Sequence, residues 1–439
     1  MVSRQSYKLT KIGEIPIDWD VQNLEEISED IFVGIATSTT EHYRQLGVPI
    51  LRNQNIKEDK LDTKELLYIS EEFSKKNKNK KLLAGDVIIV RTGYPGVSCV
   101  VPESYEGAQT FTTLVTRPVK TIIHPHFLSR YINSETGKKF VLSGQAGGAQ
   151  KNLNVSVLKK LVVPVPSINE QDKISAILSS VDETIEKTEA VIEQTEKLKK
   201  GLMQQLFIKG IGHTKFKKTD VGEIPFGWEV VGIIDIAENE KNAVKPGPFG
   251  SSLKKEFYVK SGYKVYGQEQ VIANDFTIGN YYIDDKKYEE LNAFKVKPLD
   301  LLISLVGTFG KIAVVSERGF KPGIINPRLL KITFDKSKAN VHFFKYYMSS
   351  SAFYQQLEEM SQGGTMGVIN SKILKSIHFP LPSLDEQQRI VDILTNIDQK
   401  LDIETQKREQ LQILKKGLMQ SLLTGRIRVK TDEAEVTQV

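Results

Sequence analysis

The sequence predicts a mixed α/β (α+β) protein in which two similar globular domains are separated by two long helices. Three observations support this prediction. A tryptophan-containing segment occurs twice, a proline-rich helix-start motif occurs twice, and a long seven-residue apolar pattern follows each copy of that motif. We therefore expect an internal duplication whose two helices pair as an antiparallel coiled coil.

The tryptophan-containing segments mark the beginning of each copy. Residues 12–21 read IGEIPIDWDV and residues 221–230 read VGEIPFGWEV, so that Gly13 corresponds to Gly222. The chain has only two tryptophans, and they occupy the same place in the two segments. The repeating unit is about 210 residues, much longer than a solenoid or propeller repeat, which indicates duplication of a whole domain.

The helix-start motifs are the second repeated feature. Residues 164–171 read PVPSINEQ and residues 380–387 read PLPSLDEQ. The serine of each motif is a plausible N-cap, and the glutamate three residues later has the spacing of a capping box. At the same offset of 216 residues, the heptapeptide LKKGLMQ occurs at 198–204 and again at 414–420. These matched segments surround interiors that diverge, which favours one architecture with two specificities, although neutral divergence is an alternative.

The helices that follow the motifs carry a sustained seven-residue apolar pattern. The first ladder is Ile174, Val181, Thr188, Thr195 and Leu202, with Ile177, Val191 and Leu198 in the intervening row; the second is Ile390, Ile397, Leu411 and Leu418, with Ile393 and Leu414. Such a pattern is typical of a coiled coil. Each helix of about 36 residues would be about 54 Å long. Packing of each helix on its own globular domain is the alternative.

The globular parts are predicted to contain buried strands that end in glycine turns. Residues 82–90 and 299–305 read as such strands, and they end near Gly93 and Gly307. Residues 125–132 and 342–348 read as helices, and a glycine-rich loop follows each, at 144–152 and 363–367. These loops could lie along a phosphate backbone, although ordinary surface loops have the same composition.

Composition and motifs restrict the chemistry of the chain. The net charge of +6 and pI of about 8.9 permit a polyanionic partner without requiring one. A single cysteine, Cys99, excludes a disulfide framework and a cysteine zinc site. We find no nucleotide-binding loop, methyltransferase motif, nuclease core or histidine metal motif, so we expect no catalytic residue, no metal and no cofactor on this chain. No signal peptide or membrane span is expected, which indicates a cytoplasmic protein.

Together these motifs resemble a known family. A Gly-Glu-Ile-Pro-x-x-Trp segment, a variable domain, a Pro-x-Pro-Ser-x-x-Glu-Gln motif and a helix ending in LKKGLMQ, all present twice, are similar to the specificity subunits of type I restriction-modification enzymes. The resemblance covers essentially the whole chain. It implies two target recognition domains, at 1–166 and 211–382, and two spacer helices, at 167–210 and 383–426, followed by a tail at 427–439.

The resemblance also implies partners and a division of labour in host defence. Each target recognition domain would read one half of a bipartite site in double-stranded DNA, and the helices would set the spacing between the halves. Methyltransferase subunits, two of them by expectation, would dock on the helices and carry S-adenosylmethionine for adenine methylation. Restriction subunits with motor activity would use ATP and Mg²⁺ for cleavage. The chain itself would not be an enzyme.

Candidate DNA-contacting residues are those that suit base edges and phosphates. Base contacts are assigned to amides and arginines on loops, and phosphate contacts to lysines. The first copy offers Arg52, Asn53, Asn55, Arg91, Thr92 and Lys151; the second offers Gly250, Ser251, Ser252, Lys254, Lys255, Gln268, Gln270 and Arg328. Two rival functions remain at this point: a coiled-coil scaffold joining two protein-binding domains, and a self-sufficient methyltransferase or nuclease.

Overall fold

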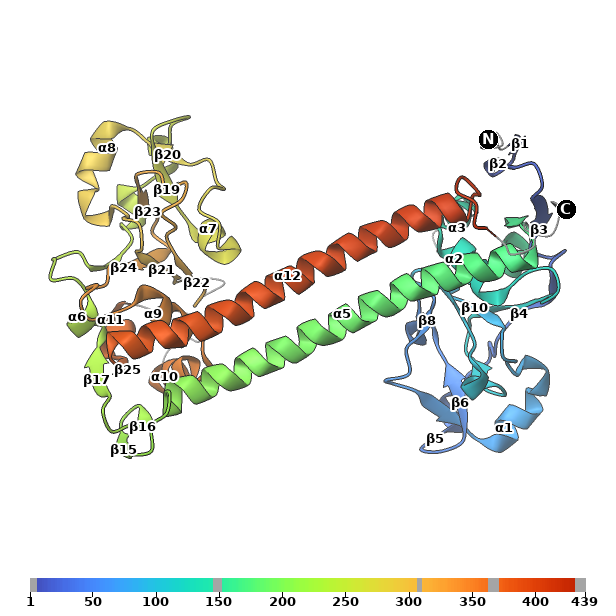
Figure 1. The fold of residues 1–439 in the computed structure, drawn as a ribbon, viewed down its shortest axis with the longest axis horizontal. Helices are drawn as coiled ribbons and strands as arrows, with labels where there is room; N and C mark the ends of the chain where they lie inside the picture. The colour runs from blue at the N-terminus through green and yellow to red at the C-terminus, as the bar shows by residue number, and fades with distance from the viewer. Residues whose placement is uncertain (1–5, 145–151, 306–309, 362–370, 431–439) are drawn as a thin grey trace, which may run out of the picture. The chain divides into compact units, whose positions relative to one another are not determined.

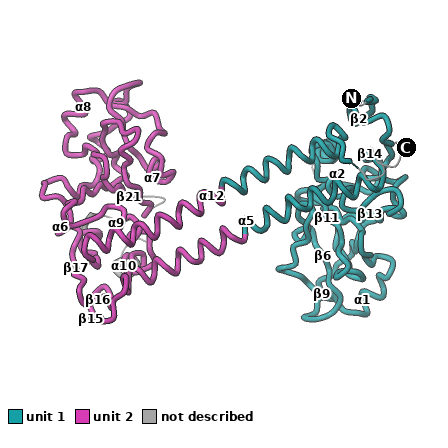
Figure 2. The backbone as a smooth tube through the Cα atoms, in the orientation of Figure 1, with its two compact units in different colours: residues 1–189, 406–439 teal, residues 190–405 magenta. Residues whose placement is uncertain are grey.

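The structure, a computed structural model, describes residues 6–144, 152–305, 310–361 and 371–430. The chain forms two compact units (Figure 2). Unit 1 comprises residues 1–189 and 406–439, and unit 2 comprises residues 190–405. Each unit thus holds one globular domain together with segments of both long helices, so neither unit is made from one copy of the repeat alone.

The globular part of unit 1 is built around two four-stranded sheets. The first has the strand order β4-β13-β10-β11 and is antiparallel throughout, and the second has the order β12-β6-β9-β5 with β6 and β12 parallel. The strands of unit 1 are β1 (Tyr7–Thr10), β2 (Gly13–Pro16), β3 (Asp20–Asn23), β4 (Ser28–Val33), β5 (Tyr43–Arg44), β6 (Val48–Leu51), β7 (Ile56–Lys57), β8 (Lys60–Leu61), β9 (Leu67–Ile69), β10 (Val87–Ile89), β11 (Ser98–Val100), β12 (Gln109–Thr110), β13 (Leu114–Pro118) and β14 (Val162–Val165). Its short helices are α1 (Glu71–Lys76), α2 (Pro125–Asn133), α3 (Glu135–Ser143) and α4 (Val155–Leu158).

Unit 2 repeats this plan. The sheet order β18-β24-β21-β22 matches the first sheet of unit 1 strand for strand, and β19 pairs with β20 antiparallel and with β23 parallel, as β6 does with β9 and β12. The strands of unit 2 are β15 (Phe216–Thr219), β16 (Gly222–Pro225), β17 (Glu229–Gly232), β18 (Val244–Pro246), β19 (Tyr263–Tyr266), β20 (Tyr282–Ile283), β21 (Leu301–Ser304), β22 (Ile312–Val314), β23 (Gly323–Ile325), β24 (Leu329–Ile332) and β25 (His378–Leu381). Its short helices are α6 (Ile233–Ile236), α7 (Gln268–Ala273), α8 (Asp285–Glu290), α9 (Val341–Met348), α10 (Ser351–Ser361) and α11 (Ser371–Ser376). The predicted duplication is therefore confirmed in the sheets as well as in the motifs.

The two long helices are α5 (Ile168–Lys209, 42 residues) and α12 (Leu384–Leu422, 39 residues), both longer than predicted. Within each unit they run antiparallel (Figure 1). In unit 1 Lys415 lies 2.6 Å from Asp182, and in unit 2 Lys199 lies 2.5 Å from Asp398. Leu178 and Leu422 belong to one apolar core in unit 1, while Phe207 and Ile390 belong to another in unit 2. In both units, therefore, the helices pack on each other and on the globular domain.

Part of the predicted seam between the helices was wrong. The ladder through Ile174, Thr188 and Thr195 is buried, but the second row is not: Ile177 is 38%, Leu198 55% and Leu414 49% exposed. Each buried threonine donates its hydroxyl to a carbonyl one turn earlier, which satisfies the polar group inside the helix. The spacing of apolar residues in the sequence does not show how wide the buried face of each helix is.

Both capping serines act as predicted, but the capping boxes do not close. The hydroxyls of Ser167 and Ser383 accept hydrogen bonds from the amides of Glu170 and Glu386, each at 3.3 Å. In a complete capping box each glutamate side chain would return to the amide of the cap residue. Here both carboxylates instead bind a tryptophan, and this alternative partner explains why the two motifs are repeated together.

Candidate nucleic-acid interface and its framework

The repeated motifs form one joint in each unit. The indole nitrogen of Trp19 donates to Glu170 at 3.0 Å, and that of Trp228 donates to Glu386 at 2.9 Å. Both tryptophans are at most 1% exposed. A buried carboxylate needs donors, and the indole N–H is one that cannot act as an acceptor. The entry segment and the helix start are thus fixed to each other by a charge-assisted hydrogen bond.

The end of the other long helix completes each joint. In unit 2, the chain leaving α5 brings His213 Nε2 to within 2.9 Å of Glu386, and the amide of Ile211 donates to the same carboxylate. In unit 1, the chain leaving α12 brings Arg428, whose guanidinium donates to Glu170 at 2.6 and 2.8 Å. Arg428 also binds Asp18, and this contact lowers the pKa of the Asp18 carboxyl.

The glutamine that ends each helix-start motif has an equally structural role. Gln171 accepts from the amide of His124 and donates to the carbonyls of Ile122 and Pro166. Gln387 makes the corresponding three bonds, with Asn340, Lys338 and Pro382. These bonds hold the N-terminus of α2 or α9 against the start of a long helix. The repeated glutamates and glutamines therefore build the framework, and their side chains are occupied by these contacts.

In the first copy, the candidate residues gather where β6 and β10 end. Asn53 donates its amide to the hydroxyl of Thr92 at 2.8 Å, and Tyr94 donates to the carbonyl of Asn53. Arg91 accepts a backbone hydrogen bond from Leu153, so the chain following the glycine-rich loop returns to this place. Residues separated by about 40 to 100 positions in sequence thus share one edge of the domain.

The two arginines of this edge are half-buried. Arg52 donates from Nη2 to the carbonyl of Glu65 at 3.1 Å, and the buried Nε atoms of Arg52 and Arg91 have no hydrogen-bond acceptor among the described residues. A buried guanidinium N–H without an acceptor is costly, which favours an anionic or carbonyl group from a ligand at this edge. Lys151, also predicted here, lies outside the described residues, as do Gly307 and the loop at 363–367.

In the second copy the same edge carries different residues. Gln268 follows β19, as Asn53 follows β6, and its amide donates to the hydroxyl of Ser304 at the end of β21. Arg328 is exposed on the turn between β23 and β24, and its carbonyl accepts from Leu305. Gly247 packs so closely on this turn that an added Cβ would lie 1.9 Å from the carbonyl oxygen of Asn326. That close approach carries the loop at 248–255 to the same edge.

Two of the predicted base-reading amides, Asn55 and Gln270, are buried and bonded to backbone groups. Asn55 is 2% exposed, and its side chain bonds to the backbone of Arg52, Asp62 and Glu65. Gln270 is fully buried, and it bonds to the backbone of Gly267 and Ile278. Each closes the turn that presents its neighbour, Asn53 or Gln268. Amides occupied by backbone in this way shape the loop and are not exposed to a base edge.

The remaining candidates of the second copy lie on the loop after β18. Gly250, Ser251 and Ser252 form a short 3-10 helix, and Lys254 and Lys255 follow it with exposed side chains. Leu253 is buried beside Val265 and anchors the loop. Phe249 is 87% exposed at the loop tip, the highest value among the large apolar side chains in the described part of the chain. A loop anchored by Leu253 that presents hydroxyls, lysines and one exposed aromatic ring suits a nucleic-acid contact.

The side chains most relevant to the predicted absence of a metal site are His124, His126 and the single cysteine, Cys99. The two imidazole rings stack 5.6 Å apart, and burial lowers the pKa of both, which favours their neutral forms. Among the described residues no group of three or more histidine, cysteine or acidic side chains is placed to hold a metal ion. Cys99 is buried in the sheet, where desolvation raises the pKa of its thiol.

The comparison with known proteins settles the family. The description "Type I restriction modification DNA specificity domain" matches residues 16–197 and again residues 225–412. The chain belongs to the type I restriction-modification specificity family. It is 32% identical to the type I restriction enzyme MjaX specificity subunit of Methanocaldococcus jannaschii, across 97% of this chain and 98% of that protein. The predicted resemblance, fold class and DNA-specificity function are confirmed, and the scaffold without a DNA role is not favoured.

Solved structures of the family share the fold. The S subunit of a type I system from M. genitalium covers 94% of this chain at 16% identity with a TM-score of 0.56. A chain from a study of complex assembly and conformational transition of the type I system covers 94% at 17% identity with a TM-score of 0.59. Separately, none of the described helices is both long enough and apolar enough to cross a membrane.

Proposed function

We propose that each globular domain of this chain reads one half of a bipartite site in double-stranded DNA. The duplicated edge supports the proposal. One amide–hydroxyl pair, Asn53–Thr92 or Gln268–Ser304, stands at corresponding strand ends of the two copies, with different residues around it. A shared architecture with different exposed groups is what two half-site specificities require, because the donor and acceptor pattern of the major groove is read by side chains.

In this proposal the long helices set the spacing of the half-sites and dock methyltransferase subunits, two of them by our expectation. At 1.5 Å per residue, α5 is about 63 Å long, close to two turns of B-DNA. The methyltransferase subunits bring S-adenosylmethionine and methylate adenine, and restriction subunits bring ATP and Mg²⁺ for translocation and cleavage. This chain supplies sequence selection without a cofactor of its own, in the cytoplasm where its DNA partner lies.

Charge supports the DNA partner. Lys254, Lys255 and Arg328 are exposed at the candidate edge of unit 2, and the chain carries a net charge of +6. Cations that contact phosphates release counterions from DNA, so affinity falls steeply as salt rises. A scaffold without a DNA role would show weak binding that depends little on salt.

The decisive experiment replaces the first recognition domain. The chain is expressed with its methyltransferase partner, methylated adenines are mapped across the genome, and residues 22–160 are exchanged for those of a relative. We expect one half of the methylated motif to change while the other half and the spacer stay the same. A motif that is unchanged, or altered in both halves, would overturn the assignment. Exchange of the equivalent region of the second copy is the matched control and should alter only the other half.

A further inference from the structure

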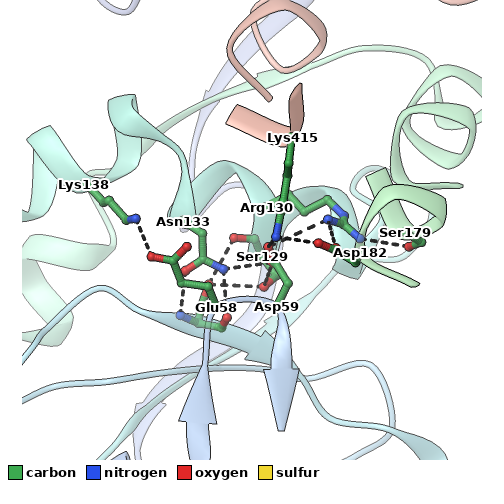
Figure 3. A network of polar contacts seen from close by, with 10 residues as sticks. Glu58, Asp59, Ser129, Arg130, Asn133, Lys138, Ser179, Asp182 and Lys415 are labelled. Carbon is green, nitrogen blue, oxygen red and sulfur yellow. Dashed lines mark hydrogen bonds and ion pairs between the residues drawn. The ribbon is translucent and has the colours of Figure 1, made fainter. Parts of the chain in front are cut away.

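The hairpin formed by β7 and β8 connects the candidate DNA edge to the long helices within unit 1. Its base is the turn that carries Arg52 and Asn53, closed by the Asn55 amide. Its tip is Glu58 and Asp59, which reach α2, α3 and α12 (Figure 3). The next residue, Lys60, forms an ion pair with Glu186 on α5. In the second copy, the corresponding turn continues into helix α7 (Gln268–Ala273). The hairpin is therefore an addition specific to the first copy.

Asp59 is the centre of the contact at the tip. It adopts a left-handed conformation with φ 59°, and its side chain is only 6% exposed. One carboxylate oxygen accepts from Ser129 at 2.8 Å and from Asn133 at 2.9 Å, both on α2. The other oxygen is buried without a hydrogen bond from any described residue, but Arg130 and Lys415 place cations 3.9 and 4.0 Å away.

Next to the hairpin lies an ion pair between the long helices, and each unit has its own copy of it. In unit 1 Lys415 on α12 binds Asp182 on α5, and in unit 2 Lys199 on α5 binds Asp398 on α12. These four residues correspond pairwise at the offset of 216, so each helix lends its lysine to the aspartate of the other. In each unit one further side chain, from α2 in unit 1 and from the corresponding position of α9 in unit 2, donates a hydrogen bond to the aspartate.

That joining side chain differs between the units. In unit 1 it is Arg130, which donates to Asp182 at 2.8 Å and to Ser179 at 2.9 Å. In unit 2 it is Tyr346, which donates to Asp398 at 2.7 Å. The arginine adds a buried positive charge that the tyrosine lacks, and Asp59 at the hairpin tip supplies the compensating negative charge. Arg130 and Asp59 are thus a pair of opposite charges that unit 1 adds to an ion-pair arrangement otherwise common to the two units.

We propose that the β7–β8 hairpin is a latch that fixes the first DNA-reading turn to the long helices, with Asp59 as its positioning residue. The inference rests on the proposed function. A turn held at its base by Asn55 and at its tip by Asp59 cannot rotate relative to α5 and α12 within unit 1. One base pair more or less in the spacer shifts and rotates a half-site, because B-DNA turns once in about 10 base pairs. A fixed turn therefore enforces one spacer length, and a released turn tolerates others.

The test uses the full chain with its methyltransferase partner and duplexes whose spacer is correct, one base pair shorter or one longer. The variant is Asp59→Asn with Arg130→Tyr, which copies the arrangement of unit 2 and leaves no unpaired buried charge. Asparagine also accepts the left-handed conformation. We expect near-native thermal stability, with the methylation rate on altered spacers, relative to the correct one, raised about fivefold or more, as coupled residues in one network allow. If the variant is stable and the ratio of methylation rates on altered and correct spacers is unchanged, the hairpin does not determine spacer length and the proposal is wrong.

One matched pair of variants and one separate control test this interpretation. Lys415→Met removes the hairpin-facing cation, whereas Lys199→Met removes the same ion pair where there is no hairpin. Only the first should relax spacer choice, and equal effects would refute the latch. Glu58→Gln breaks only an exposed pair with Lys138 at the tip and should change nothing. If the wild-type complex methylates no duplex that carries the mapped motif, the proposed function is wrong. If the wild-type complex methylates such a duplex but the variants do not relax spacer choice, only the latch proposal is wrong.

Discussion

Phe249 shows what the residue scale adds to the sequence. The loop that carries it is held by Gly247 on one side and Leu253 on the other, so its ring is exposed because of the fold and not because the segment is loose. Isolated exposed apolar residues are common on proteins. This one lies beside Lys254 and Lys255, at the end of the sheet where Gln268 also lies. A ring in this position suits contact with a DNA base step.

We therefore predict that Phe249→Ala weakens DNA binding by the assembled complex about tenfold without lowering thermal stability. Burying a phenylalanine ring is worth about 1.5–3 kcal/mol, and an exposed ring stabilises the free protein little. Fluorescence anisotropy with the cognate duplex measures the loss. Phe226→Ala, which removes a 66% exposed ring in the repeated segment 221–230 and not on this loop, is the control that should bind normally. Equal affinity in both variants would remove Phe249 from the interface.

Asp59 gives a prediction about pH. Burial raises the pKa of its carboxyl above the ordinary value of 3.8, although Arg130 and Lys415 oppose the shift. An acid whose pKa is raised on folding holds its proton more tightly in the native state, so its charge costs stability as pH rises from the unfolded towards the folded pKa. Urea unfolding of the wild type and of Asp59→Asn from pH 3 upward should show the wild type losing stability relative to the variant across that window. A constant difference would contradict this.

At the scale of elements, the Trp–Glu joint accounts for the repeated motifs. The sequence predicted both helix starts from their capping serines, and the structure confirms them. It could not predict that Glu170 would turn towards Trp19, because the two are separated by 151 positions and are brought together by the pairing of strands β3 and β14. Two motifs that recur together indicate a shared structural role, but the sequence alone does not show which of their residues are in contact.

The same limit applies to the candidate interface. Asn53 and Gln268 were chosen because amides suit base edges, and the same reasoning chose Asn55 and Gln270. Only burial separates the two pairs, and burial depends on which backbone groups the turn leaves without a partner. The Asp59 hairpin was missed for a related reason. A Glu-Asp turn reads as an ordinary solvated surface until α2 and α12 are placed against it.

For the joint, we predict that Trp19→Phe lowers the free energy of unfolding by about 1.5–3 kcal/mol, the value of a hydrogen bond to a charged group. Phenylalanine preserves most of the apolar packing but leaves Glu170 with one donor fewer. Calorimetry of the intact chain should record a lower transition temperature, and Trp228→Phe should have a similar effect through Glu386. A transition unmoved by either change would mean that the indole bond adds nothing to the packing of the ring.

At the scale of the whole chain, each unit is completed by a distant segment. Unit 1 includes residues 406–439, which follow the second recognition domain, and Arg428 from that segment contacts Glu170 and Asp18. In unit 2 the corresponding position is taken by His213, at the end of the first helix. The duplication therefore produced two reciprocal units, and neither copy of the sequence folds around its own residues alone.

We predict that Arg428→Ala destabilises the first recognition domain, although about 260 residues separate Arg428 from the Glu170 carboxylate. Removing one partner of a buried pair leaves a charge without compensation and costs about 3 kcal/mol or more. Hydrogen exchange should show faster exchange in β3 and β14, which surround the joint, and a lower first transition temperature. Arg426→Ala, two residues earlier and exposed, is the control expected to behave as wild type. Equal protection in both variants would show that the tail does not complete the joint.

The reciprocal completion has a consequence for protein synthesis. The ribosome makes residues 1–189 first, but the helix segment and arginine that close their core begin at residue 406. At about 5–20 residues per second, the first domain waits for roughly 10–40 seconds before its last partner emerges. During that interval the nascent chain holds a Trp19–Glu170 joint that lacks Arg428, and α5 lacks its α12 partner. Because residues 406–439 follow the second recognition domain, the first domain gains its last helix contacts only after the second domain has been translated.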